Sequence, residues 1–123
     1  MGQSHPVRPT ALIVENDPAQ RELLSVLLEE SDLTVIQCES AEAAVLVLEK
    51  SAARLVMLFT EVSLAGAMDG IELASIAKRR LPDLNVIVSS DPPRLRRLPD
   101  GTQFLAKPWR PLDVLREAER AMH

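Results

Sequence analysis

The chain has 123 residues, a formal net charge of −4 and a hydrophobic content of 46%, a length that suits one domain with its own core. The acidic balance and the scarcity of aromatics (only Phe59, Phe104 and Trp109) argue against a nucleic-acid partner. A single cysteine excludes an internal disulfide, and no apolar run is long enough to span a membrane. We therefore expect a cytoplasmic protein with no membrane partner, in which residues 1–9 form a flexible polar arm and residues 10–123 form the domain.

The first apolar run, Ala11–Val14, predicts a strand that is buried on both faces. Asp17-Pro18 then predicts the start of a helix that ends near Ser31, because an aspartate N-cap followed by proline is a typical first turn. Gln20 is placed to complete a capping box with Asp17. The helix positions expected to be buried are Leu23, Leu24, Leu27 and Leu28.

The rest of the chain continues the alternation of strands and helices. In chain order, the predicted elements are strand Leu33–Cys38, helix 40–50, strand Leu55–Thr60, helix 69–81, strand Asn85–Ser89, strand Gln103–Ala106 and helix Pro111–Ala121. Ser40 caps one of these helices, and Asp69 with Glu72 is a capping-box signature for another. Prolines at 92, 93 and 99 leave room for at most a turn or two of helix around Arg94–Leu98. The helix between the last two strands is therefore expected to be shortened.

Five such units predict a three-layer α/β sandwich, in which helices cover both faces of a five-stranded parallel sheet. The expected strand order is 2-1-3-4-5, the flavodoxin-like arrangement, and ligands bind such sheets beyond the carboxyl ends of the strands. Polar segments follow four of the strands at this edge, namely Glu15-Asn16-Asp17, Glu61, Ser89-Ser90 and Lys107-Pro108. They are expected to meet in one pocket that handles a phosphoryl group.

From about Thr10 to Ala121, the chain resembles the receiver domains of bacterial two-component response regulators. The resemblance rests on four segments in order: Leu12-Ile13-Val14-Glu15-Asn16-Asp17-Pro18, Phe59-Thr60-Glu61-Val62 followed by Met68-Asp69-Gly70, Val86-Ile87-Val88-Ser89, and Phe104-Leu105-Ala106-Lys107-Pro108. It implies a stand-alone domain of a phosphorelay rather than an enzyme. Its partners would be proteins, either a sensor histidine kinase or another signalling protein.

In that family, an acidic pair after the first strand and an aspartate after the third bind Mg²⁺, and that aspartate accepts a phosphoryl group. A hydroxyl and a lysine hold the phosphoryl oxygens, and an aromatic residue in the last strand changes rotamer. Carried over to this sequence, the resemblance gives the acidic pair to Glu15 and Asn16, the phosphoacceptor position to Glu61, and a metal-facing main-chain carbonyl to Ser63. It gives the hydroxyl to Ser89, the cation to Lys107 and the aromatic position to Phe104.

The sequence departs from the family pattern at two of these positions. Asn16 replaces a carboxylate by a neutral amide, and Glu61 carries its carboxylate one C–C bond further out, about 1.5 Å. A misplacement of about 1 Å can cost on the order of a hundredfold in rate. We therefore expect no cofactor and no catalytic residue, at most weak Mg²⁺ binding, and an atypical receiver that is not phosphorylated. The longer Glu61 can also reach Lys107 and imitate part of the charge of a phosphorylated aspartate.

Other interpretations of these residues remain open from the sequence. One is a conventional receiver that still accepts a phosphoryl group, and another is a small phosphoryl-transfer enzyme, although no glycine-rich phosphate loop is visible. Asp17 is a helix cap before it is a metal ligand, and Glu61 taken alone could be a solvated loop acid. The last helix and the residue before it carry apolar positions that either cover the sheet or form a partner or homodimer face, and these are Trp109, Leu112, Leu115 and Ala118.

Overall fold

The structure, a computed structural model, describes residues 8–91 and 96–123. Its strands are β1 (Thr10–Val14), β2 (Thr34–Cys38), β3 (Leu55–Glu61), β4 (Asn85–Ser90) and β5 (Thr102–Ala106). Its helices are α1 (Pro18–Glu30), α2 (Ala41–Ser51), α3 (Gly70–Arg80) and α4 (Pro111–Met122), with a 3₁₀ turn at Ala52–Arg54. None of the described helices has the length and apolar character needed to cross a membrane.

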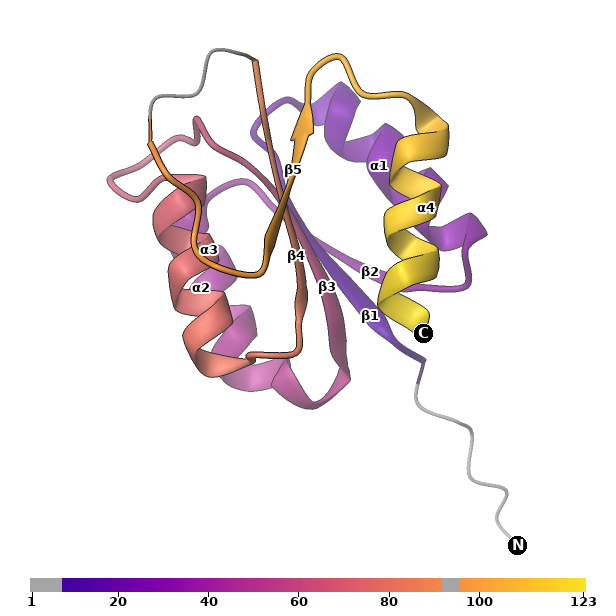
Figure 1. Ribbon diagram of the computed structural model, residues 1–123, viewed down its shortest axis with the longest axis horizontal. Coiled ribbons are helices and arrows are strands. Elements are labelled where there is room, and N and C mark those ends of the chain that lie inside the picture. The colour runs from indigo at the N-terminus through magenta and orange to yellow at the C-terminus, as the bar shows by residue number, and fades with distance from the viewer. Residues whose placement is uncertain (1–7, 92–95) are drawn as a thin grey trace, which may run out of the picture.

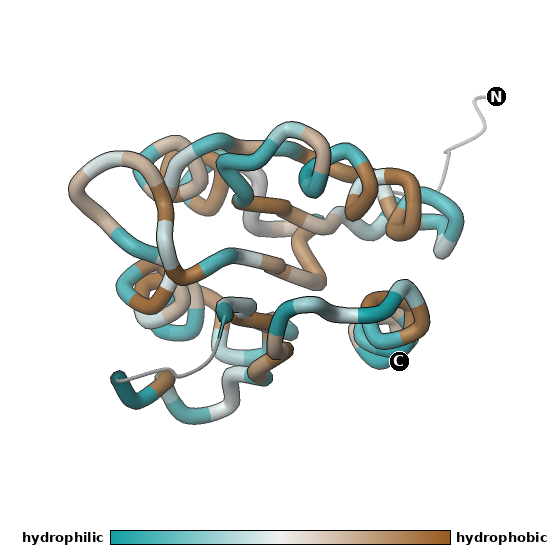
Figure 2. The backbone as a smooth tube through the Cα atoms, turned by 90° about the horizontal axis from the view of Figure 1, so that it is seen from above, coloured by the Kyte–Doolittle hydropathy of each residue, from teal (hydrophilic) through white to brown (hydrophobic). Residues whose placement is uncertain are grey.

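The strands form one parallel sheet in the order β2-β1-β3-β4-β5, which confirms the predicted topology. Helices α1 and α4 lie on one face of the sheet, and α2 and α3 lie on the other (Figure 1). Seen from above, hydrophobic strand segments lie between the two helical layers (Figure 2). The three-layer α/β sandwich predicted from the sequence is therefore confirmed.

Three of the predicted helix caps are formed. Asp17 accepts a hydrogen bond from the Ala19 main-chain N–H at 3.0 Å, and the Ser40 hydroxyl oxygen accepts one from Ala43 at 3.1 Å. Asp69 forms a full capping box at the start of α3. The capping box predicted for Gln20 is wrong, because Asp17 caps the second helical N–H instead of the third, and Gln20 Oε1 is buried without a partner among the described residues.

The core is aliphatic and lies on both faces of the sheet. All five residues of β1 are buried, and Phe59 meets Trp109 edge to face with ring centroids 6.1 Å apart. The only cysteine, Cys38, is buried in β2, and its burial raises the pKa of its thiol.

The buried faces of the outer helices differ partly from the prediction. Leu24, Leu27 and Leu28 are buried, whereas Leu23 is 46% exposed, because it lies on the flank of α1 rather than on the face toward the sheet. On α4 the apolar positions are divided. Ala118 is buried and Leu115 packs on the core with Trp109, so these positions cover the sheet, whereas Leu112 is 49% exposed.

Only part of the connection between β4 and β5 lies within the described residues. Residues 96–101 contain no helix, so the last part of the short helix expected around Arg94–Leu98 is not helical. Residues 94 and 95 lie outside the described residues, as do residues 1–7 of the expected N-terminal arm.

Candidate functional site

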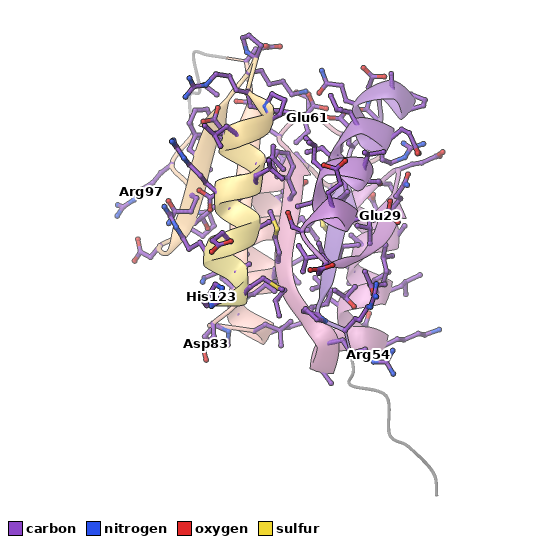
Figure 3. The ribbon with its side chains drawn as sticks, turned by 90° about the vertical axis from the view of Figure 1, so that its right-hand side faces the viewer. Glu29, Arg54, Glu61, Asp83, Arg97 and His123 are labelled. Atoms are coloured by element: carbon purple, nitrogen blue, oxygen red, sulfur yellow. The ribbon has the colours of Figure 1, made fainter. Side chains whose placement is uncertain are left out.

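The carboxyl ends of β1, β3, β4 and β5 place four polar segments at one edge of the sheet. Glu61 is the last residue of β3 and lies opposite Ser89 of β4. The Val62 N–H donates to the Ser89 carbonyl at 2.9 Å, and the Lys107 N–H donates to the Ser90 carbonyl at 3.0 Å. Figure 3 shows Glu61 at the opposite end of the molecule from Asp83, where strand β4 is about to begin. Parallel pairing thus brings the predicted residues to one place.

Lys107 forms the centre of the site. Its ammonium group makes an ion pair with Glu61, and its Nζ lies 3.4 Å from Glu15 Oε1. The exposed fraction of the side chain is 12% for Lys107, 16% for Glu61 and 2% for Glu15. The Lys107 ammonium group therefore forms ion pairs with two carboxylates in a largely buried site.

Asn16 and Asp17 satisfy the remaining carboxylate oxygens. With its amide nitrogen turned toward the two carboxylates, Asn16 donates to Glu61 Oε2 at 3.1 Å and to Glu15 Oε2 at 3.2 Å. The Asp17 main-chain N–H also donates to Glu15 Oε2, at 3.0 Å. Asn16 therefore acts as a donor that holds the two acids side by side, a role that a carboxylate at this position could not fill.

The pKa values of Glu61 and Lys107 are both raised in this cluster. Burial and the neighbouring Glu15 carboxyl raise the pKa of Glu61, and the attraction of Lys107 offsets them only in part. Burial alone would lower the pKa of Lys107, but the hydrogen bond that Lys107 donates to Glu61 and the charges of both acids outweigh it, so the pKa is raised. The two shifts have different main causes, since burial disfavours the charged form of Glu61, whereas the neighbouring carboxylates favour the charged form of Lys107.

The backbone around Glu61 is held by a close approach of helix α3. A Cβ placed on Gly70 would lie 1.9 Å from the Glu61 carbonyl oxygen, so only glycine fits. The Gly70 N–H donates to the Val62 carbonyl at 2.9 Å, and the Thr60 hydroxyl donates to the Glu61 carbonyl at 3.0 Å. These contacts fix the direction in which the Glu61 side chain leaves the sheet.

The loop after Glu61 is tied to helix α2 by Glu42, a residue that the sequence analysis missed. The Glu42 carboxylate accepts hydrogen bonds from the main-chain N–H groups of Ala67 and Met68, each at 3.0 Å. Gly66, at φ +98°, lies directly against that carboxylate. No short-range pattern points to Glu42, because it lies about 25 residues before the groups that it binds.

The other predicted site residues lie around this cluster without joining it by side-chain hydrogen bonds. Ser89 is fully buried, and its hydroxyl has no hydrogen-bond partner among the described residues. Ser63 is an exposed loop residue, and Phe104 is half-buried in β5. The structure thus brings together Glu15, Asn16, Glu61 and Lys107. Across residues 8–91 and 96–123, no three His, Cys, Asp or Glu side chains gather as a metal-binding group.

Comparison with known proteins assigns this arrangement to a family. The model of the response regulator receiver domain matches residues 11–119. The chain belongs to this family. Receiver domains act in two-component signalling, where they interact with histidine kinases and other signalling proteins. A search of curated proteins found no match to this receiver domain.

Solved structures show the same fold at low sequence identity. A response regulator receiver protein from Sinorhizobium medicae superposes with a TM-score of 0.83 at 18% identity, over 94% of each chain. The signal receiver domain of an HD domain-containing protein from Pseudomonas fluorescens gives a TM-score of 0.82 at 22% identity, again over 94% of each chain. The receiver domain of the hybrid histidine kinase CckA gives 0.79 at 24% identity, over 93% of this chain and 99% of that one.

Proposed function

We propose that this receiver domain is atypical: it is not phosphorylated, and it signals through protein contacts from a conformation that its own side chains hold. The observation that supports this proposal is the ion pair between Lys107 and Glu61. In the family, the corresponding lysine holds phosphoryl oxygens and the corresponding acid accepts the phosphoryl group. Here the two side chains already satisfy each other, so the lysine contact needs no phosphate.

The metal position fits Mg²⁺ poorly. Mg²⁺ requires near-octahedral coordination by oxygen at about 2.0–2.1 Å. Asn16 turns its amide nitrogen toward the two acids, Glu15 Oε2 accepts the Asp17 N–H, and Lys107 lies against both carboxylates. A metal ion would have to displace Lys107 and rotate Asn16 before it could be bound by these oxygens.

The acceptor position fits phosphoryl transfer poorly as well. A carboxylate nucleophile must approach phosphorus in line at about 3–3.5 Å, and the transferred group needs cations to neutralise its charge. The Glu61 carboxylate reaches further out than an aspartate would, and it is held there by Lys107 and Asn16. Its position imitates part of the negative charge of an acyl phosphate, with fewer oxygens and a lower charge.

The proposal is tested with a small phosphodonor. Incubation with acetyl phosphate and Mg²⁺, followed by intact-protein mass spectrometry, should show no phosphoryl adduct on the unmodified chain. The double variant Asn16→Asp/Glu61→Asp should acquire one adduct, because it restores the acidic pair and shortens the acceptor. The matched control is Asn16→Asp/Glu61→Ala, which has the acidic pair without an acceptor and should stay unmodified.

Two outcomes would count against the proposal. An adduct mapped to Glu61 in the unmodified chain would make this a conventional receiver that accepts a phosphoryl group. A double variant that folds but remains unmodified would show that positions 16 and 61 are not what prevents the reaction.

A further inference from the structure

Residues Arg96–Gly101, which lead into β5, form a strap beside helix α3 and contain no helix. Figure 1 shows this orange segment running along α3 before it turns into β5. Arg97, labelled in Figure 3, points away from the molecule, whereas Leu98 packs against the core under α2 and α3.

One end of the strap is fixed to the first turn of α3 by an ion pair. The Arg96 guanidinium group contacts Asp69 Oδ2. The other oxygen of the same carboxylate, Oδ1, accepts the Glu72 N–H at 2.9 Å and so caps α3. Asp69 therefore belongs to the helix cap and to the strap contact at the same time.

The other end of the strap lies against the last turn of α3. Gly101 has a φ of +81°, and a Cβ placed there would lie 3.2 Å from Lys78 Cε. The Lys78 ammonium group is itself fixed, because it donates to the carbonyls of Pro82 at 2.8 Å and Leu84 at 3.0 Å. The strap thus contacts α3 near both of its ends.

The start of α3 is in turn pressed against the backbone of Glu61. Gly70 directly follows Asp69, and its Cα lies so close to the Glu61 carbonyl that no side chain would fit between them. A shift of the Glu61 main chain would therefore push on the first turn of α3, including the carboxylate that Arg96 contacts. Packed elements transmit such shifts because they do not deform continuously.

We propose that Asp69 couples the Glu61–Lys107 ion pair to the strap, with Arg96 as the positioning residue at the strap's end. The inference goes beyond the proposed function, since it holds whether or not Glu61 can be phosphorylated. Energetic coupling between two places is reciprocal. Loss of the ion pair should loosen the strap, and loss of the strap contact should loosen the backbone around Glu61.

Hydrogen exchange of the full chain, read by mass spectrometry without phosphodonor, tests the coupling. Asp69→Asn removes the charge that Arg96 contacts and keeps an oxygen that can cap α3, because asparagine is an N-cap as good as aspartate. The strap peptide should exchange about two- to fivefold faster, as expected for a partly exposed ion pair, while the amides of α3 stay protected. Arg97→Ala is the matched control, since it removes the neighbouring arginine, whose ion pair within the described part of the chain is with the exposed Asp100, and it should leave strap exchange unchanged.

The decisive comparison breaks the ion pair at the distant site. Both Lys107→Met and the milder Glu61→Gln should accelerate exchange in the strap, with peptides of buried β1 reporting any global unfolding. Strap exchange equal to the unmodified chain in both variants, while the segment around Glu61 exchanges faster, would refute the coupling. Unchanged strap exchange in Asp69→Asn would show that the Arg96 contact does not hold the strap. Neither result depends on whether an adduct forms with acetyl phosphate.

Discussion

At the scale of single residues, the site is defined by an imbalance of charge. Glu15 and Glu61 share one ammonium group in a place where all three side chains are largely removed from water. An unpaired charge costs much more there than at the surface. We therefore expect Lys107 to stabilise the fold as well as to fix the geometry of the site.

Replacing Lys107 by Met should lower the free energy of unfolding by about 3 kcal/mol at neutral pH, because two buried acids lose their cation. The deficit should shrink as the pH falls. The folded-state pKa of Glu61 is raised, and removing Lys107 raises it further, so the folded variant binds a proton more readily than the unfolded chain. Stability linked to that proton is present at low pH and is lost as the pH rises through the folded-state pKa. Urea unfolding from pH 4 to pH 8 measures the effect.

The matched variant for this prediction is Lys107→Met/Glu61→Gln. It removes the excess charge by substitution instead of protonation, so it should recover most of the stability at neutral pH and flatten the pH dependence. A single variant that loses the same stability at every pH would contradict the charge argument and point to lost packing of the lysine stem.

At the scale of elements, the loop between β3 and α3 is held by α2 as well as by its own strand and helix. Hydrogen bonds from its own main-chain N–H and from the N–H groups of Met68 and Ala67 lower the pKa of Glu42. Since these donors lie in the loop that follows Glu61, the carboxylate of α2 fixes the main chain close to the site.

Glu42→Ala should destabilise the chain at neutral pH and leave Ala67 and Met68 without their acceptor. A lowered folded-state pKa contributes stability above the unfolded-state pKa, and this contribution is lost as the pH falls through the folded-state value. The difference between the variant and the unmodified chain should therefore disappear on the acid side of about pH 4. Amide exchange at residues 67 and 68, measured by NMR, should be faster in the variant, because these N–H groups lose their acceptor.

The control for this prediction is Glu49→Ala, which removes an exposed acid further along the same helix and should change neither the loop nor the pH dependence. If the two substitutions changed stability and loop exchange equally, Glu42 would act by stabilising helix α2 and not through its contact with the loop.

The elements themselves were largely predictable from the sequence, because their signals are local. The buried run before Glu15, the Asp17-Pro18 start and the Asp69 capping box are all formed as expected. The burial predicted for Leu23 was wrong, since a leucine-rich helix does not show which of its flanks meets the sheet. The capping box predicted for Gln20 was wrong because Asp17 caps the Ala19 N–H instead. The contacts of Glu42 and Arg96 could not be predicted, because each of them joins residues at least 25 positions apart.

At the scale of the whole molecule, the sheet order explains why the sequence also indicated the site. Once the order 2-1-3-4-5 was inferred, residues at the carboxyl ends of β1, β3 and β5 had to meet at one edge, and Glu15, Glu61 and Lys107 do meet there. The orientation of the Asn16 amide, and the lack of a partner for the Ser89 hydroxyl among residues 8–91 and 96–123, depend on side-chain geometry that the order of strands does not determine.

Because Cys38 is buried, the rate at which its thiol is labelled reports local opening of the protein. The only thiol of the protein is 8% exposed and packs in the core beneath α2 and α3. A maleimide or disulfide reagent should therefore react with the native chain slowly, at a pace set by how often that helical layer lifts, and promptly in urea. Labelling rates across the Lys107, Glu42 and Asp69 variants would rank how far each contact restrains the layer, without any engineered probe. Rapid labelling of the native chain would mean that the layer already separates freely in solution.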